Sequence, residues 1–433
     1  MEQFLQGELS RHQLPAAYAV VVNGEVLLEG ACAGNDADTP FEIGSITKSF
    51  TATAILQLRD KGLLDLDAPV RKYLPWFTLK DEAAAGKITL RHLLTNSSGI
   101  PTNAMWPPLQ GDYARVWRSI EEGVRGLARV KPAFEPGAKF MYSNMGFAVL
   151  GAVVQAVSGR SWASYVQEEI MVPLGMTRSL ADLHEGRLPL AVPHSWVFGR
   201  PWPVRHRLLG PFMAPAGSTT ICSVRDLARY IAAHMGAIPL PGVSPASLEE
   251  AHRGVHSMSE KHRYAMGWVD GVAKGGERVV WHNGGTEGSR SSAMFAPDHG
   301  VGFVLLTSRT NGLVDVLAGS VMAILLGREA SPVKAPPDYF RTMSWILNGI
   351  TLLAVGLLIW LAWSLTTGAP VGWGKTVLFA LLSAASGYSV LVWLPRQGIP
   401  PISHIRLWRV DVLLAFGGLL LASTLWLLYS LIQ

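Results

Sequence analysis

Three short groups of polar residues in this chain contain the side chains that acyl-transfer chemistry requires. The first is Ser45-Ile46-Thr47-Lys48. On a helix, residues i and i+3 lie on one face, so the Lys48 amine can reach the Ser45 hydroxyl. Serine is a weak nucleophile until a base removes its proton, and lysine can be that base where burial lowers its pKa from about 10.4. The spacing therefore predicts Ser45 as a nucleophile with Lys48 as its partner.

The same pattern occurs a second time, at Ser331-Pro332-Val333-Lys334. This copy lies in a proline-containing linker, so the pattern alone does not identify a nucleophile. A serine at the N-terminus of a helix has an advantage, because backbone N–H groups and the positive end of the helix dipole stabilise a developing oxyanion. The surrounding elements must therefore distinguish the two serines.

The second and third groups are Tyr142-Ser143-Asn144 and His282-Asn283-Gly284-Gly285. A tyrosine near a lysine can pass protons between nucleophile and leaving group. The alternative for Tyr142 is a core aromatic residue whose hydroxyl is hydrogen-bonded. His282 follows an expected strand, and the small residues after it can line a cleft and offer a backbone N–H.

The elements that must position these groups are read from hydrophobic periodicity and turn residues. Asn23-Gly24 lies within an alternating stretch, residues 17–28, which predicts a hairpin. A helix is expected over residues 45–59, beginning at the first motif. Further helices are expected at 88–94, 146–157 and 314–326, strands at 264–272, 278–282, 289–296 and 302–307, and long loops at 97–140 and 183–215.

In this order, the three groups resemble the motifs of the penicillin-binding protein and class C β-lactamase superfamily of serine hydrolases. The resemblance covers residues 10–327 and includes segments at 41–44, 63–75, 88–100, 134–151, 173–176 and 223–230. It implies an α/β (α+β) fold, with helices flanking an antiparallel sheet beside an all-helical subdomain. No Gly-x-Ser-x-Gly elbow occurs in the chain, which argues against an α/β-hydrolase.

The resemblance also implies roles for individual residues. Ser45 is the expected acylated nucleophile, Lys48 its base partner, and Tyr142 the residue that exchanges protons with Lys48. The expected oxyanion hole is formed by the N–H groups of Ser45 and Gly285, and the expected substrate contacts are Asn144 and His282. No cofactor and no metal are expected. His252, His256 and His262 lack an acidic partner motif and are expected on the surface.

His282 departs from the β-lactamase pattern, in which a lysine is expected at this position. A histidine with a pKa of about 6.5 is mostly neutral at pH 7 and is a poor anchor for a substrate carboxylate. Peptidases and esterases of the superfamily use such a histidine, so a peptidase or amidase for D-amino-acid-containing peptides is favoured. The alternatives are an esterase, a β-lactamase or a DD-carboxypeptidase, and, from another class, a catalytically silent binding or regulatory membrane protein.

The composition points to two different parts of the chain. Of its 433 residues, 49% are hydrophobic and only 16% are charged, against about 25% in an average soluble chain. After residue 341 the charged residues are only Lys375, Arg396, Arg406, Arg409 and Asp411. The net charge is +5, which is too small an excess over this length to indicate nucleic-acid binding. The expected partners are a small peptide, amide or ester substrate and a lipid bilayer.

Three apolar runs, at 344–365, 376–394 and 412–432, are each about 20 residues long, which is enough to span a bilayer. They predict a multi-pass membrane domain at 344–433, joined by a linker at 328–343 to a hydrolase domain at 1–327. This combination resembles membrane-bound D-peptidases that mature peptide prodrugs on the outer side of the membrane. The positive charges that flank the runs and the missing export signal instead favour a hydrolase domain on the cytoplasmic side of the membrane.

Overall fold

The computed structural model describes residues 1–101, 119–197, 200–203, 211–286, 288–329, 333–334, 339–367, 418, 420–421 and 424–425. The described residues fall into two units. The larger unit comprises the described residues of 1–194, 211–329 and 333–334 and contains all three motifs. The second contains the described residues of 195–203 and the helix α11 (Tyr339–Thr367).

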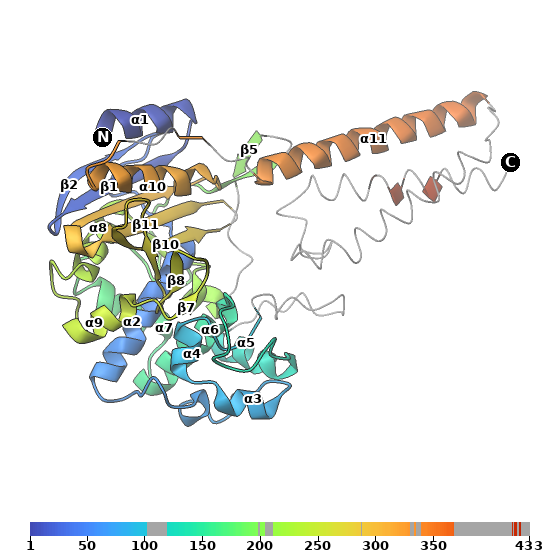
Figure 1. Ribbon diagram of the computed structural model, residues 1–433. Helices are drawn as coiled ribbons and strands as arrows, with labels where there is room; N and C mark the ends of the chain where they lie inside the picture. Colours follow the sequence, from blue (N-terminus) through green and yellow to red (C-terminus); the bar gives the residue numbers. More distant parts are fainter. Residues whose placement is uncertain are drawn as a thin grey trace. The chain divides into compact units, whose positions relative to one another are not determined.

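An eight-stranded antiparallel sheet organises the larger unit (Figure 1). Its strand order is β2-β1-β12-β11-β10-β9-β8-β7. Asn23 and Gly24 join β1 to β2 with φ angles of 49° and 88°, as expected for a tight hairpin turn. The strands are β1 (Ala16–Val22), β2 (Glu25–Ala31), β7 (His256–Ser257), β8 (His262–Tyr264), β9 (Val269–Val272), β10 (Arg278–Gly285), β11 (Arg290–Ala296) and β12 (Val301–Thr307).

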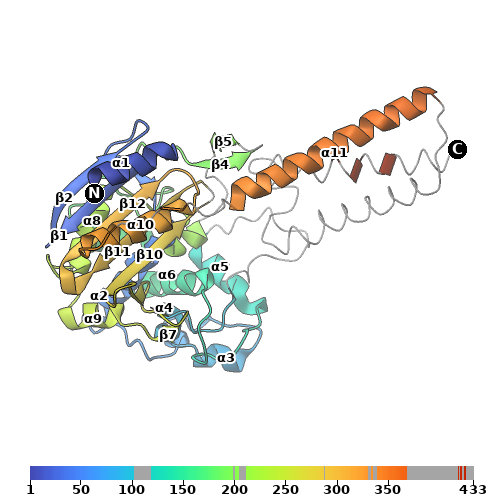
Figure 2. The same ribbon diagram turned by 45° about the horizontal axis from the view of Figure 1, so that its top comes forward.

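Helices cover both faces of this sheet, and each face has its own hydrophobic core. On one face lie α1 (Glu2–Arg11) and α10 (Leu313–Leu325) (Figure 2). Strand β1 shows the alternation, because Tyr18 packs with this first core while Ala17 and Ala19 pack with the second. On the second face lie α8 (Val224–His234), which contacts β1 and β12, and the helix that carries the first motif.

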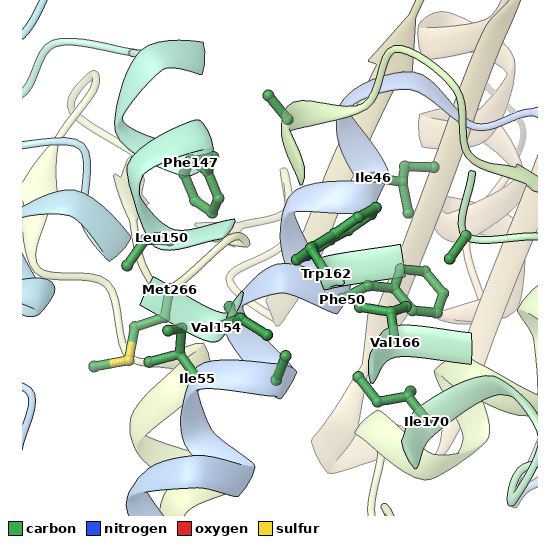
Figure 3. Packing of buried hydrophobic residues seen from close by; sticks show 14 of the residues in the cluster. Ile46, Phe50, Ile55, Phe147, Leu150, Val154, Trp162, Val166, Ile170 and Met266 are labelled. Carbon is green, nitrogen blue, oxygen red and sulfur yellow. The ribbon is translucent and has the colours of Figure 1, made fainter. Parts of the chain in front are cut away.

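That helix, α2 (Thr47–Asp60), is surrounded by further helices on the second face of the sheet. Figure 3 shows Ile46 and Phe50 of this segment near Trp162 and Val166, with Phe147 and Leu150 across the same cluster. Three helices contact α2 directly: α6 (Asn144–Ser158), α7 (Trp162–Val166) and α9 (Pro245–His252). Helices α4 (Leu90–Leu94) and α5 (Ile120–Gly126) pack on α6, and α3 (Glu82–Lys87) contributes to the same core. The expected α/β class, an antiparallel sheet with flanking helices, is confirmed.

Three expected elements differ from the structure. The expected loop 97–140 contains the helix α5. Residues 264–272 were expected to form one strand, but the chain forms β8, a turn and β9. Gly267 causes the break, because it has a φ of +73° and packs so closely against α2 that a Cβ would lie 2.7 Å from the Lys48 carbonyl oxygen. The expected loop 183–215 contains a hairpin of β4 (His194–Val197) and β5 (Arg200–Pro203).

The predicted multi-pass membrane localisation is wrong. Within the part of the chain that the structure describes, no helix has the length and apolar character required to cross a membrane. The first expected span, 344–365, lies in α11, a helix of 29 residues. The second, 376–394, lies outside the described residues, as does the third, 412–432, apart from five positions.

Candidate active site

Ser45 and Lys48 lie where the chain passes from β3 (Phe41–Glu42) through the short turn η1 (Gly44–Ile46) into α2. Residues 46–58 are all buried, whereas Ser45 is partly exposed. The Nζ atom of Lys48 lies 3.0 Å from the Oγ atom of Ser45, as the i, i+3 spacing predicts. The hydroxyl is therefore accessible to a substrate while its amine partner is enclosed.

The Lys48 amine is fully buried and has no carboxylate partner among the described residues. Nζ donates a hydrogen bond to the Ala216 carbonyl oxygen at 2.6 Å. Burial disfavours the charged form and lowers the pKa of Lys48 well below its usual range. The rings of Tyr142 and Phe147, 4.9 and 5.6 Å from Nζ, act in the opposite direction, since an aromatic face attracts a cation.

The magnitudes decide which effect prevails at Lys48. A desolvated cation–π contact is worth about 2 kcal/mol. Full burial of a lysine shifts its pKa by up to about 3–5 units, and each unit corresponds to about 1.4 kcal/mol. Burial therefore outweighs the two rings and favours a neutral amine, which is the form that can accept a proton.

Tyr142 lies in the segment that leads into α6, and Asn96 holds that segment on both sides. The Asn96 carbonyl oxygen accepts from the Met141 N–H at 2.8 Å, and its Oδ1 accepts from the Ser143 N–H at 3.0 Å. Ser143 caps α6 by accepting from the Gly146 N–H. Burial raises the pKa of Tyr142 well above its usual range, and a hydrogen bond with Ser45 only partly offsets this. Tyr142 is therefore a protonated phenol beside the serine.

His282 lies on β10 with both ring nitrogens engaged within the protein. Nδ1 is 2.7 Å from the Asn283 carbonyl oxygen, and a carbonyl can only accept, so Nδ1 carries the proton. Nε2 then accepts from the Tyr264 hydroxyl at 3.3 Å. Burial lowers the pKa of His282 to about 3, and the charge of Arg290 acts in the same direction. The imidazole is neutral at pH 7.

Gly285 ends β10 beside the turn that carries the serine. A Cβ atom on Gly44, whose φ is +50°, would lie 2.5 Å from the Gly285 nitrogen. A Cβ atom on Gly284 would lie 1.9 Å from the Ile43 carbonyl oxygen, which also accepts a hydrogen bond from Ser291 Oγ at 2.7 Å. The end of β10 thus packs directly on the residues before Ser45, and this close contact places the Gly285 N–H next to the nucleophile turn.

Gly284→Ala is expected to lower hydrolytic activity by about 100-fold to 1000-fold, the effect of losing one oxyanion donor. The added methyl group meets backbone atoms that cannot rotate away, so the end of β10 must move. The free energy of unfolding should fall by about 3 kcal/mol, as in other overpacked interiors. Ester hydrolysis and urea unfolding measure the two effects.

Gly319→Ala on α10 is the matched control, because nothing lies within 4 Å of its added Cβ. Its activity should be unchanged, and alanine should raise the unfolding free energy by up to about 1 kcal/mol through helix propensity. Wild-type activity in the Gly284 variant would contradict the close packing of β10 against Ile43.

Asn144 is the first residue of α6, next to the capping Ser143 and two residues after Tyr142. The three expected surface histidines do not form a metal cluster, and no group suited to a metal ion occurs among the described residues. His252 differs from its expected surface position, because it is buried and Nε2 lies 2.9 Å from Nδ1 of His234. The ring of Trp268 packs against both histidines.

Several residues that shape the site were not identified from the sequence. Ala216 binds the Lys48 amine through its carbonyl, Asn96 holds the segment of Tyr142, and Tyr264 binds His282. Gly217 packs against Gly44, since its Cβ would lie 2.0 Å from the Gly44 carbonyl oxygen. The sequence contains a local indication for two of them. Asn96 lies within the stretch 88–100 that resembles the family, and Gly217 lies in the run of small residues Pro-Ala-Gly-Ser.

Comparison with known proteins concerns the family and the fold of the chain. Residues 1–324 match the family model described as "Beta-lactamase". Among curated proteins, "Penicillin-binding protein 4" of Amycolatopsis lactamdurans is 28% identical over 356 residues, which cover 76% of this chain and 90% of that protein.

Two solved structures have the same fold. One is described as the octameric penicillin-binding protein homologue from Pyrococcus abyssi, with 25% identity and a TM-score of 0.65; the match covers 81% of this chain and 80% of that one. The other is a D-stereospecific amidohydrolase from Streptomyces sp., with 28% identity and a TM-score of 0.57; the match covers 68% of this chain and 90% of that one.

Proposed function

This chain belongs to the beta-lactamase family of serine acyl-transfer hydrolases, and we propose that it is a peptidase or amidase for peptides that contain D-amino acids. The observation that carries this proposal is the Ser45–Lys48 pair, with 3.0 Å between Oγ and Nζ and a fully buried amine. A small peptide with a D-residue next to the scissile amide is the proposed substrate, including peptides that carry an N-acyl-D-amino-acid cap.

Acylation begins with the transfer of the Ser45 proton to Lys48. One N–H of the neutral amine is held by the Ala216 carbonyl at 2.6 Å, so its lone pair is available for the hydroxyl proton. The Oγ atom attacks the substrate carbonyl carbon, and the carbonyl oxygen becomes negative. When the tetrahedral intermediate collapses, the C–N bond breaks and the leaving amine takes up a proton. Water then hydrolyses the ester on Ser45 and restores the free enzyme.

Tyr142 is the proposed route for the proton between Lys48 and the leaving amine. Its ring lies 4.9 Å from Nζ of Lys48, and its hydroxyl bonds with Ser45. Because burial raises the pKa of Tyr142, the phenol gives up its proton only as it receives another, which suits a relay better than a stored phenolate. The relay delivers to the amine the proton that Lys48 took from Ser45.

The proposed oxyanion hole consists of the N–H groups of Ser45 and Gly285. Preorganised donors of this kind stabilise charge that develops only in the transition state. The close packing of Gly44 against the Gly285 nitrogen brings the two backbone segments together. Asn144, at the start of α6, is the proposed contact for the substrate amide.

The neutral His282 favours peptide or amide substrates over β-lactams. An imidazole with a pKa of about 3 supplies no positive charge at pH 7, so it cannot hold a substrate carboxylate as the lysine of β-lactamases is expected to. The D-stereospecific amidohydrolase from Streptomyces sp. adds support as a relative of the same fold. An esterase, β-lactamase or DD-carboxypeptidase of this fold is the alternative function.

Hydrolysis of paired chromogenic peptides tests the proposal. N-acetylated dipeptide p-nitroanilides with a D-residue or an L-residue before the scissile amide should differ in kcat/KM by about 100-fold or more in favour of D. A preference for the L-peptide, or faster turnover of a cephalosporin or a p-nitrophenyl ester than of either peptide, would contradict it. The absence of both turnover and covalent labelling by a fluorophosphonate would indicate a catalytically silent protein.

A further inference from the structure

Another tyrosine, Tyr264, lies behind Tyr142 and is not part of the proposed proton route. It ends strand β8 and is fully buried. Its ring meets the ring of Tyr142 edge-on, with centroids 6.0 Å apart and an angle of 86° between the planes. The ring of Phe140 packs on it at 5.6 Å. Tyr264 therefore forms part of the wall against which Tyr142 rests.

The hydroxyl of Tyr264 completes the hydrogen bonding of His282. Since Nδ1 of His282 donates to the Asn283 carbonyl at 2.7 Å, Nε2 is an acceptor, and Tyr264 is the donor that faces it at 3.3 Å. Burial raises the pKa of Tyr264 well above its usual range, so this donor keeps its proton. Both ring nitrogens of His282 are then hydrogen-bonded within the protein, and neither is available to bind a substrate.

The groups around His282 form one connected set. Its ring lies 6.3 Å from the ring of Tyr142 and 6.0 Å from that of Tyr264. The charged or titratable groups that act on it from neighbouring elements are Lys48 on α2, Arg290 on β11, Tyr142 before α6 and Tyr264 on β8. Arg290 is paired with Asp315. A shift of the imidazole would therefore be transmitted to Tyr142 through direct ring contact.

We propose that Tyr264 is a positioning residue that acts through His282 and Tyr142, and that His282 supports Tyr142 instead of binding the substrate. The hydroxyl of Tyr264 fixes the orientation and the tautomer of the imidazole. The two rings together hold the Tyr142 phenol at its place beside Ser45 and Lys48. This inference rests on the proposed function, because it assumes that acylation occurs at Ser45 and that Tyr142 moves the proton.

Labelling rates test the role of Tyr264 without requiring a known substrate. The probe is a fluorophosphonate, followed by intact-protein mass, which gives a first-order labelling constant and a half-saturating concentration. Its fluoride leaves without a proton, so the constant reports the attack by Ser45, whose hydroxyl is oriented by its hydrogen bond with Tyr142. Tyr264→Phe keeps the ring and loses only the hydroxyl, so the first-order constant should fall by about tenfold with half-saturation changed less than twofold. In Tyr264→Leu, which also loses the ring contacts, the first-order constant should fall by about 100-fold. This is the effect of misplacing a reacting group by about 1 Å.

Tyr18→Phe is the matched control, because Tyr18 is also a fully buried strand tyrosine but packs in the core on the α1 and α10 face. Its labelling constant should equal that of the wild type. Thermal unfolding of each variant shows whether it is folded. Should Tyr264→Phe fail to fold, His282→Gln provides the same readout, with the same expected tenfold loss.

The double variant Tyr264→Phe/His282→Gln separates action through His282 from two independent structural effects. If Tyr264 acts through His282, the double variant loses no more than the larger single loss, whereas independent effects multiply. A product of the two losses, or a wild-type rate in Tyr264→Phe, would overturn the proposal.

Paired peptides that end in a carboxylate or a carboxamide test whether His282 contacts the substrate. In His282→Gln the ratio of their kcat/KM values should stay within twofold of the wild-type ratio. A change of more than fivefold would return His282 to the substrate contacts and overturn the inference. Failure of the wild type to label at Ser45 is a different result, since it overturns the proposed function itself.

Discussion

Ser45→Ala is expected to abolish covalent labelling by a fluorophosphonate and to lower kcat by about a million-fold, the loss seen when a serine nucleophile is removed. The buried Lys48 amine lies 3.0 Å from Ser45 Oγ. No other serine among the described residues is paired with a buried lysine amine. The fold should be preserved, because Ser45 is partly exposed and loses two hydrogen bonds, with Lys48 and Tyr142, each worth about 1 kcal/mol. Intact-protein mass after labelling, together with urea unfolding, measures both expectations.

The second Ser-x-x-Lys sequence supplies the matched control. Ser331 and Lys334 repeat the spacing of Ser45 and Lys48, so Ser331→Ala removes the same group from the same local pattern. Its labelling should equal that of the wild type. Full labelling of Ser45→Ala would mean that Ser45 is not the nucleophile. Loss of labelling in Ser331→Ala would also contradict the assignment of Ser45.

Local patterns were sufficient to predict the elements that carry the first motif. The alternation around Asn23-Gly24 predicts the β1–β2 hairpin, since two residues with positive φ fit the twist of the strands. The apolar spacing after Ser45 predicts α2, and the i, i+3 relation then places the lysine amine beside the hydroxyl. These are short-range relations, in which one residue determines where another lies a single turn away.

The surroundings of the motifs depend on segments that are distant in the chain. Ala216 reaches the Lys48 amine from 168 positions away, and Ser291 reaches Ile43 from 248. In both contacts the acceptor is a backbone carbonyl, which every residue type has, so no residue type identifies it. Tyr264 was likewise placed only in a strand, because nothing local distinguishes a tyrosine that packs in a core from one that holds a histidine.

The break between β8 and β9 shows the same limit. A run of alternating residues over 264–272 fits one strand, and a glycine in the middle of a strand is compatible with a bulge. What requires a turn is the backbone of Lys48, since a Cβ on Gly267 would lie 2.7 Å from its carbonyl oxygen. That contact exists only after α2 has docked on the sheet, so periodicity along the chain cannot reveal it.

Lys48→Met is expected to lower the acylation rate by about 1000-fold to 10,000-fold, because it removes the base and keeps the length of the side chain. The wild-type labelling rate should rise with pH as Lys48 loses its proton. Since burial lowers the pKa of Lys48, the rise should be complete well below the pKa of about 10.4 of a free lysine. Labelling by a fluorophosphonate across a pH series measures both effects, and a wild-type rate in Lys48→Met would contradict the assignment of the base.

The same substitution should stabilise the protein at pH 7. A methionine fills the volume of the lysine stem without a buried amine, and replacing buried ionic groups by apolar side chains of similar volume often stabilises proteins by about 1–4 kcal/mol. Lys87→Met is the control, since Lys87 forms only an exposed ion pair with Glu135 and should change neither the rate nor the unfolding free energy by more than about 1 kcal/mol.

The pH dependence of this stabilisation tests the state of Lys48 directly. Between its folded pKa and about 10.4 the unfolded chain binds a proton that the folded chain does not, so wild-type stability rises with pH. The contribution of Lys48 is therefore least favourable at low pH and recovers as pH approaches the unfolded value. In Lys48→Met this contribution is absent, so its advantage over the wild type should shrink by about 1.4 kcal/mol for each pH unit across that window. An advantage that stays constant from pH 7 to pH 10 would mean that Lys48 is charged in the folded protein, and a charged amine cannot take the proton of Ser45.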